Sequence, residues 1–219
     1  MNDEAAEGGE LPARAREQGD DRVSDERQRC WWIGDPATAD PAMVRYHDEE
    51  WGIPVHDDTE LFERLILECF QAGLSWSTIL HKREGFRAAF AGFDATAIAA
   101  FDDADRARLM ADAGIVRNRA KVDAGIANAA AFLAIVAEHG SFAAYLGSVV
   151  GRAPGVAALA LPPGTTMTDL APTTPASDAL SADLKRRGFR FVGPTIAYAF
   201  MESVGLVDDH LPGCWRYRG

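Results

Sequence analysis

The sequence has few cysteines and no long apolar run, and both shortages restrict its class. Three cysteines in 219 residues are too few for a disulfide framework, which favours a reducing, intracellular setting with cysteines free or bound to a metal. The most apolar stretch, residues 126–137, is too short to cross a membrane and contains Asn128. No secretory signal is recognisable near the N-terminus. We therefore expect a cytoplasmic protein without a membrane partner.

Signatures of several common enzyme classes are also missing. The chain has no G-x-S-x-G sequence, which would indicate a serine hydrolase, and no phosphate-binding or dinucleotide-binding glycine pattern. Alternation of apolar and polar residues, the pattern of a strand, does not run for a useful length, and no internal repeat is present. These absences favour an all-α fold.

Negative charge is in excess, with 33 acidic residues against 22 lysines and arginines and a formal net charge of −11. Residues 1–28 hold nine acids and four bases and few large apolar side chains, so we expect a disordered acidic tail before a single domain over 29–219. Net acidity argues against a nucleic-acid partner, but basic residues gather at 117–121 and 185–190. Such runs fit either a nucleic-acid contact or a solvated helix face.

Helical spacing of apolar residues dominates the part after the tail. Capping residues and glycine stops divide it into predicted helices. These cover 57–70, a segment starting near 77, 94–101, 103–114, 117–138, 141–151, 177–188 and 193–205. Residues 152–176 are rich in Pro, Gly and Thr and predict a long loop, a feature that is usually functional or mobile.

Cysteine and histidine occur near both ends of the predicted domain. Cys30 and His47 lie near its start, and His210 and Cys214 lie near its end. Two thiolates and two imidazoles suit tetrahedral Zn²⁺, and four protein ligands would make such a site structural rather than catalytic. The spacing is not that of a zinc finger, so the residues alone leave open that the histidines are ordinary surface residues.

The stretch LMADAGIVRNRAK (109–121) predicts two helices joined by a short turn at Gly114, a helix-hairpin-helix near 104–121. Such a turn directs backbone N–H groups and a helix N-terminus at a DNA phosphate. Three basic residues open the second helix: Arg117, Arg119 and Lys121. The position where this module usually has a second glycine is Val116, and an ordinary helix–helix corner is the alternative.

One acid lies at the edge of an apolar helix face, close in sequence to many aromatic residues. Glu68 is beside Leu61 and Leu65 on the helix predicted at 57–70, and Arg64, one turn before it, offers an ion pair. The aromatic residues around it are Trp31, Trp32, Tyr46, Trp51 and Trp76. Clustered aromatics often form core. Flat rings beside a carboxylate also suit a flat heterocycle, which stacks on the rings and donates from its edge.

Taken together, these segments resemble DNA-3-methyladenine glycosylase I, a bacterial family of base-excision repair. The resemblance covers about 29–215 and rests on RCWW, YHDEEWGIP, LFERLILECFQAGLSW, DAGIVRNRAK, SDALSADLKRRGFRFVGPTIAYAFMESVGLVDDH and HLPGC. It implies the all-α helix-hairpin-helix glycosylase fold. It also implies a structural zinc site that joins the termini through four ligands: Cys30, His47, His210 and Cys214.

The resemblance further implies roles for the site residues. Glu68 matches the carboxylate that recognises the alkylated base and is the expected catalytic residue. The rings expected to bind the base are Tyr46, Trp76, Trp32 and Trp51. The residues expected to contact the DNA backbone are Gly114, Arg117, Arg119 and Lys121.

The activity implied is that of a monomeric, monofunctional glycosylase acting on the nucleoid in a bacterial cytoplasm. It would flip N3-methyladenine out of double-stranded alkylated DNA and hydrolyse the glycosidic bond, leaving an abasic site. Two other interpretations stay open on the residues alone. A non-enzymatic, zinc-stabilised DNA-binding module would not need Glu68 and its rings. A zinc hydrolase would need an open coordination position.

Overall fold

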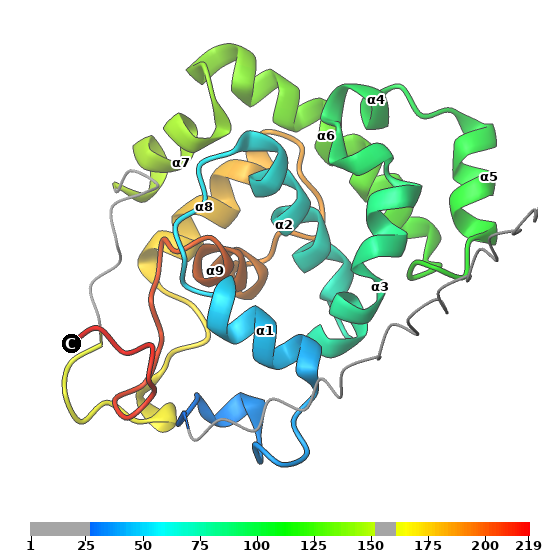
Figure 1. Cartoon of the computed structure of the whole chain (residues 1–219). Helices are drawn as coiled ribbons and strands as arrows, with labels where there is room; N and C mark the ends of the chain where they lie inside the picture. Colours follow the sequence, from blue (N-terminus) through cyan, green and yellow to red (C-terminus); the bar gives the residue numbers. More distant parts are fainter. Residues whose placement is uncertain (1–26, 152–160) are drawn as a thin grey trace, which may run out of the picture.

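The computed structural model describes residues 27–151 and 161–219, which form helices and loops without a β-strand (Figure 1). The expected all-α class is confirmed. The elements in chain order are η1 (Trp31–Ile33), α1 (Pro41–Glu49), α2 (Asp58–Gln71), α3 (Trp76–Ala89), η2 (Ala91–Phe93), α4 (Ala95–Ala99), α5 (Asp103–Ala111), α6 (Arg119–His139), α7 (Phe142–Val150), η3 (Met167–Asp169), α8 (Pro175–Arg186) and α9 (Pro194–Ser203). Nearly all of the expected acidic tail and part of the expected long loop lie outside the described residues.

Helix α2 lies in the middle of the helices (Figure 1) and packs against α3, α6, α7 and α9. Every residue from 61 to 70 is buried. Asp57 caps the helix by accepting from the Glu60 N–H, as the sequence predicts. The Glu60 carboxylate does not complete a capping box, because it bonds to Arg64 at 2.6 Å. Since α2 is buried on all sides, any polar side chain in its middle must find a partner in the protein or in a ligand.

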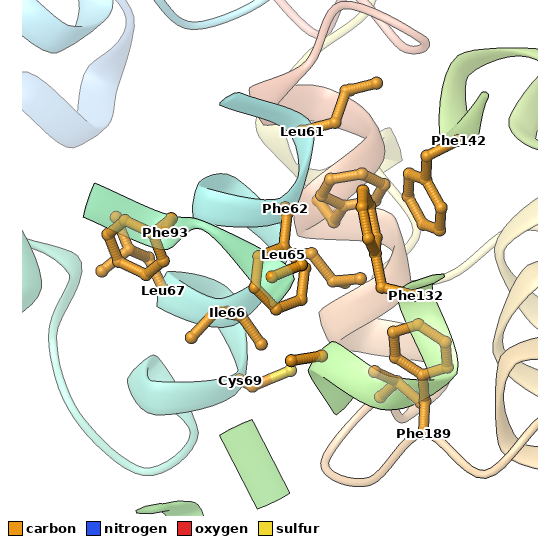
Figure 2. Close-up of a cluster of buried hydrophobic side chains, with 14 of the residues drawn as sticks. Leu61, Phe62, Leu65, Ile66, Leu67, Cys69, Phe93, Phe132, Phe142 and Phe189 are labelled. Atoms are coloured by element: carbon orange, nitrogen blue, oxygen red, sulfur yellow. The ribbon is translucent and has the colours of Figure 1, made fainter. Parts of the chain in front are cut away.

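Phenylalanine rings fill the space between α2, α6 and α7 (Figure 2). The Phe132 ring of α6 contacts Phe62 of α2 and Phe142 of α7, and both pairs of centroids are 4.7 Å apart. Burying one such side chain contributes roughly 1.5–3 kcal/mol. These contacts fix α6 and α7 against the central helix.

Helix α6, with 21 residues, belongs to the core. Its length and composition alone would allow it to cross a membrane, but half of its apolar window is buried inside the protein. Asn128 on its inner face is fully buried and bonds to both backbone groups of Arg190, accepting at 2.8 Å and donating at 3.1 Å. Gly140 ends the helix in the left-handed conformation.

Helix α1 was not predicted from the sequence. Asp40 caps it by accepting from the Ala42 N–H, and Pro41 occupies its first turn. The buried face of this short helix contains Tyr46 and His47, two residues that apolar periodicity does not identify as core. Tyr46 and His47 are consecutive, so one helix positions both an expected ring of the base site and an expected metal ligand.

The two ends of the domain are held together by hydrogen bonds. The backbone N–H of Trp215 donates to the Gln28 carbonyl at 2.8 Å, and its indole N–H donates to Asp48 at 3.0 Å. The Arg29 guanidinium also donates to the Asp48 carboxylate, with the shortest nitrogen–oxygen distance at 2.6 Å. Gln28, expected in the tail, is therefore in contact with the domain.

Candidate active site and metal-ligand cluster

An aromatic cavity of about 300 Å³ lies between α1, α2, α3 and α9. The five residues expected to recognise or bind the base all line it: Glu68, Tyr46, Trp76, Trp32 and Trp51. They come from different elements, so the fold brings together residues that the sequence separates by up to 44 positions. Further lining residues, which the sequence alone does not identify, include Met43, Gln71, Ala199, Glu202 and Asp209.

The rings of the aromatic cavity contact one another and leave flat faces for a ligand. The centroids of Tyr46 and Trp76 are 5.1 Å apart at a tilt of 53°. Trp32 meets the Trp51 ring edge-on at 5.2 Å. Trp76 begins α3 directly after the Ser75 cap, which fixes its position at the α2–α3 turn. Such an arrangement suits a flat heterocycle that stacks on π faces.

Among the described residues, the Glu68 side chain has no ion pair, unlike those of Glu60, Glu63 and Arg64 on the same helix. Its side chain is 3% exposed, and its Oε2 atom has no hydrogen-bond partner among the described residues. The ion pair with Arg64 suggested by the sequence does not form, because the Arg64 guanidinium binds Glu60, Glu50 and the Ser203 carbonyl instead. The carboxyl group is therefore available to a ligand in the cavity.

Burial controls the protonation of this carboxyl group. Loss of water raises the pKa of Glu68 to about 8, although the charge of Arg64 opposes the rise. Burial and the neighbouring Glu68 also raise the pKa of Tyr46, which keeps its phenol neutral. The indole N–H of Trp76 is a second buried polar atom without a partner among the described residues. Unpaired buried polar groups indicate a ligand that would complete them.

Two further acids of the cavity were missed from the sequence. Glu202 and Asp209 are hydrogen-bonded to each other, and Asp209 accepts from the Tyr198 hydroxyl at 2.6 Å. Burial raises the pKa of Glu202, and the charges of Asp209 and Glu68 add to the rise. Burial also raises the pKa of Asp209, although hydrogen bonds with Tyr198 and Glu202 oppose the rise. An acid in the last turn of an apolar helix was the signal that could have found Glu202.

A second cluster, the metal-ligand cluster, lies behind this cavity. Cys30, His47, His210 and Cys214 are all buried, and one ligand atom from each lies within 4.8 Å of the others. Cys214 Sγ is 3.3 Å from His47 Nε2 and 3.6 Å from His210 Nδ1, and Cys30 Sγ is 3.6 Å from His210 Nδ1. Atoms bound tetrahedrally at about 2.0–2.3 Å from one ion stand roughly 3.5 Å apart, so these four fit a metal.

The outer nitrogens of both histidines are also engaged. His47 Nδ1 is 2.7 Å from Asp48 Oδ1, and His210 Nε2 is 3.3 Å from the Trp51 carbonyl. Burial raises the pKa of Asp48, but hydrogen bonds from Arg29, His47 and Trp215 outweigh it and lower the pKa. Contacts of this kind orient histidines that bind metals.

The metal-ligand cluster supports one wall of the aromatic cavity. The ring centroids of Trp51 and His210 are 4.6 Å apart, and Trp51 also lines the cavity. Cys30 belongs to both the cluster and the cavity wall. Fixing the ligands therefore fixes Trp51 and the Trp32 ring that rests on it.

The predicted hairpin is present as α5, a turn over residues 112–118, and α6. Gly114 packs against Gly85 of α3 so closely that a Cβ at Gly85 would lie 2.5 Å from the Gly114 carbonyl oxygen. The Gly114 N–H donates to Asp112 at 2.7 Å, and Asn118 caps α6. The α5 helix ends at Ala111, earlier than predicted, because the cap of the turn begins at Asp112.

Lys121 does not face solvent, and its expected contact with the DNA backbone is corrected. Its side chain is 7% exposed, and its ammonium group donates to the carbonyls of Phe70 and Ala72 at 2.8 and 2.6 Å. The cation thus binds the C-terminal end of α2, where free carbonyls favour positive charge. Arg117 and Arg119 are exposed, although Arg119 is paired with Asp123 at 3.2 Å.

Comparison with known proteins decides the family. The sequence model described as methyladenine glycosylase matches residues 36–217. The chain belongs to the methyladenine glycosylase family. It is 46% identical over 192 residues to DNA-3-methyladenine glycosylase 1 of Escherichia coli (strain K12), covering 88% of this chain and 98% of that protein.

Solved structures of methyladenine glycosylases share the fold. A crystal structure of 3-methyladenine DNA glycosylase I superposes with a TM-score of 0.78 at 46% identity, covering 87% of this chain and all of the other. A variant of 3-methyladenine DNA glycosylase I in complex with 3-methyladenine superposes with a TM-score of 0.75 at 36% identity, covering 83% and 96%.

The raised pKa of Glu68 predicts a stability effect of Glu68→Gln. The protonated carboxyl stabilises the folded state fully below pH about 4.5, and this contribution is lost as pH rises through about 8. Glutamine stays neutral, so we expect the variant to match the parent near pH 4 and to be more stable by about 2–4 kcal/mol near pH 9. Denaturant unfolding at both pH values measures this. A variant with the same stability difference at both pH values would contradict it, and Glu49→Gln, at an exposed position, is the control.

Proposed function

We propose that this chain is a monofunctional glycosylase that excises 3-methyladenine from double-stranded alkylated DNA. The observation that carries the proposal is the unpaired carboxyl group of Glu68 in a cavity walled by aromatic rings. Family membership supports the reaction class. The protein acts as a monomer in the cytoplasm, where its DNA substrate lies.

The cavity suits a base that is cationic until it leaves. Methylation at N3 gives the adenine ring a positive charge, which is attracted to the π faces of Tyr46, Trp76 and Trp32. The same charge favours the ionised form of Glu68, which then accepts a hydrogen bond from the edge of the base. Because this pairing is available only to a base removed from the stack, it also stabilises the flipped nucleotide.

Hydrolysis then follows from the weakness of the glycosidic bond. The bond between N9 and C1′ breaks, its electron pair neutralises the cationic base, and the oxygen of water forms the new bond to C1′. The water proton goes to solvent. The leaving group departs neutral, so the protein need not protonate it, and the interactions in the cavity supply orientation and charge stabilisation.

The hairpin supplies the contact with the DNA backbone. Arg117 and Arg119 provide positive charge, and the turn at Gly114 allows close approach of the phosphate. Lys121 does not contact DNA itself. Its ammonium group joins the first turn of α6 to the end of α2. This link holds the hairpin at a fixed distance from Glu68, which lies near the C-terminal end of α2.

The metal-ligand cluster is proposed to hold a structural Zn²⁺ through Cys30, His47, His210 and Cys214. Two thiolates and two imidazoles are the donor set that zinc prefers, and four protein ligands leave no position for a reactive water. The ion would cross-link the segments that carry Cys30, His210 and Cys214 to α1, which carries His47. This argues against a zinc hydrolase, and the aromatic cavity argues against a simple DNA-binding module.

An excision assay on methylated duplex DNA tests the activity. We expect the parent to release 3-methyladenine, identified by chromatography, and to leave abasic sites without strand breaks. Glu68→Gln should lower the rate about 10- to 100-fold, as expected for loss of one hydrogen bond to a charged group. The control Glu49→Gln should keep the parent rate. If Glu68→Gln releases 3-methyladenine at the parent rate, Glu68 has no role in the reaction.

Metal analysis and unfolding test the zinc proposal. We expect one zinc per chain, and loss of both zinc and thermal stability in Cys214→Ser. Cys69→Ala, which changes a buried cysteine outside the cluster, should retain its zinc. Zinc-depleted protein that stays folded should still excise the base, because the metal does no chemistry. Complete loss of activity in such folded protein would show that the metal acts in the reaction.

A further inference from the structure

The loop between α8 and α9 presents an aromatic side chain in a strained conformation. Phe191 has φ of +57°, in the left-handed region that bulky residues rarely adopt. Its side chain is 39% exposed. Neither the aromatic cavity nor the hairpin includes it.

Phe93 shows how such strain is normally compensated. Its φ is +62°, and its ring is 1% exposed and packed in the core, so burial of the ring offsets the backbone cost. The ring of Phe191 gains much less from burial. Strain that persists without burial needs another cause, and functional contacts are the common one.

Buried polar side chains hold the residue before Phe191 in place. The amide group of Asn128 on α6 pairs with both backbone groups of Arg190, at 2.8 and 3.1 Å. The Cys69 thiol of α2 also donates to the Arg190 carbonyl at 3.7 Å. Three hydrogen bonds from two helices therefore converge on one exposed loop residue.

The residue after Phe191 is fixed in the same manner. The Ser181 hydroxyl of α8, itself buried, donates to the Val192 carbonyl at 2.6 Å, and the Val192 side chain is fully buried. Because both neighbours are fixed, Phe191 cannot relax by shifting the loop. The ring is presented rigidly.

The position of this loop links the two parts of the proposed site. Cys69, which bonds to the loop, directly follows Glu68 in α2. Asn128 lies two helical turns after Lys121, or about 10 Å along α6, and Lys121 anchors the hairpin. After the loop, α9 continues to Ala199 and Glu202, which line the aromatic cavity. The loop that carries Phe191 is therefore bonded to α2, which carries Glu68, and to α6, which begins at the hairpin.

Charge at the loop also favours DNA. Arg190 is exposed, and its guanidinium group makes no hydrogen bond or ion pair with the parts of the chain that the structure describes. An unpaired cation next to an exposed ring matches the two features of a DNA strand, its phosphates and its apolar sugar and base surfaces.

We propose that Phe191 is a DNA-contacting residue, whose ring packs on the sugar and base surface next to the flipped nucleotide while Arg190 binds an adjacent phosphate. The proposal rests on the proposed function, because it takes duplex DNA as the partner. In this assignment the backbone strain at Phe191 is the cost of a rigid, preorganised contact.

Binding measurements on two substrates test the proposal. The first is a duplex with a stable abasic-site analogue, and the second is free 3-methyladenine, followed by tryptophan fluorescence. We expect Phe191→Ala to bind the duplex roughly 5- to 100-fold more weakly, as expected for loss of one aromatic stacking contact. Its affinity for free 3-methyladenine should stay at the parent value.

Two more variants separate a DNA contact from a structural role. Phe191→Gly removes the backbone strain, so we expect higher thermal stability together with weak duplex binding. Phe191→Trp keeps an aromatic ring and should bind the duplex nearly as the parent does. Parent-like duplex affinity of Phe191→Ala, or lower stability of Phe191→Gly with weakened binding of the free base, would overturn the proposal. If the parent binds DNA but releases no base, the proposed function fails, and the affinity ratios still decide the role of Phe191.

Discussion

The proposed active site depends on one unpaired carboxyl group, that of Glu68, which is buried on the central helix α2. Burying an acid without a partner is costly, and the protein limits the cost by keeping the group protonated, with a pKa of about 8. A cationic ligand reverses this preference, because its charge stabilises the ionised carboxylate. Under the proposed function, the same group therefore destabilises the free protein and provides affinity for a charged base, in keeping with the trade between stability and activity at many active sites.

The remaining parts hold this group and its rings in fixed geometry. Helix α2 is surrounded by other helices, so Glu68 cannot turn toward solvent. The metal-ligand cluster supports Trp51, and Lys121 joins the hairpin to the end of α2. In the loop before α9, Asn128 and Ser181 fix the backbone on both sides of Phe191. These buried polar residues therefore position the surfaces that we propose to contact DNA and the base.

Much of the fold and of the aromatic cavity could be predicted from the sequence, because periodicity, caps and clustered residue types are local signals. The cap at Asp57 and the grouping of Glu68 with the rings are examples. The rest depends on distant partners. Lys121 was assigned to DNA because it lies in a basic run, whereas its partners are carbonyls about fifty positions away. Glu202 and Asp209 form a pair only after α9 folds back, and the left-handed φ of Phe191 has no sequence signal since the residue is not glycine.

Direct titration of Glu68 tests whether its carboxyl group is protonated in the free protein. The side-chain carboxyl carbon of Glu68, observed by NMR in protein labelled at glutamate and assigned with Glu68→Gln, reports its protonation as pH is raised. We predict a midpoint near pH 8 in the free protein. A midpoint near pH 4.5 would mean that the carboxyl is ionised and stabilised without a ligand, and would contradict the proposed response of Glu68 to a cationic base.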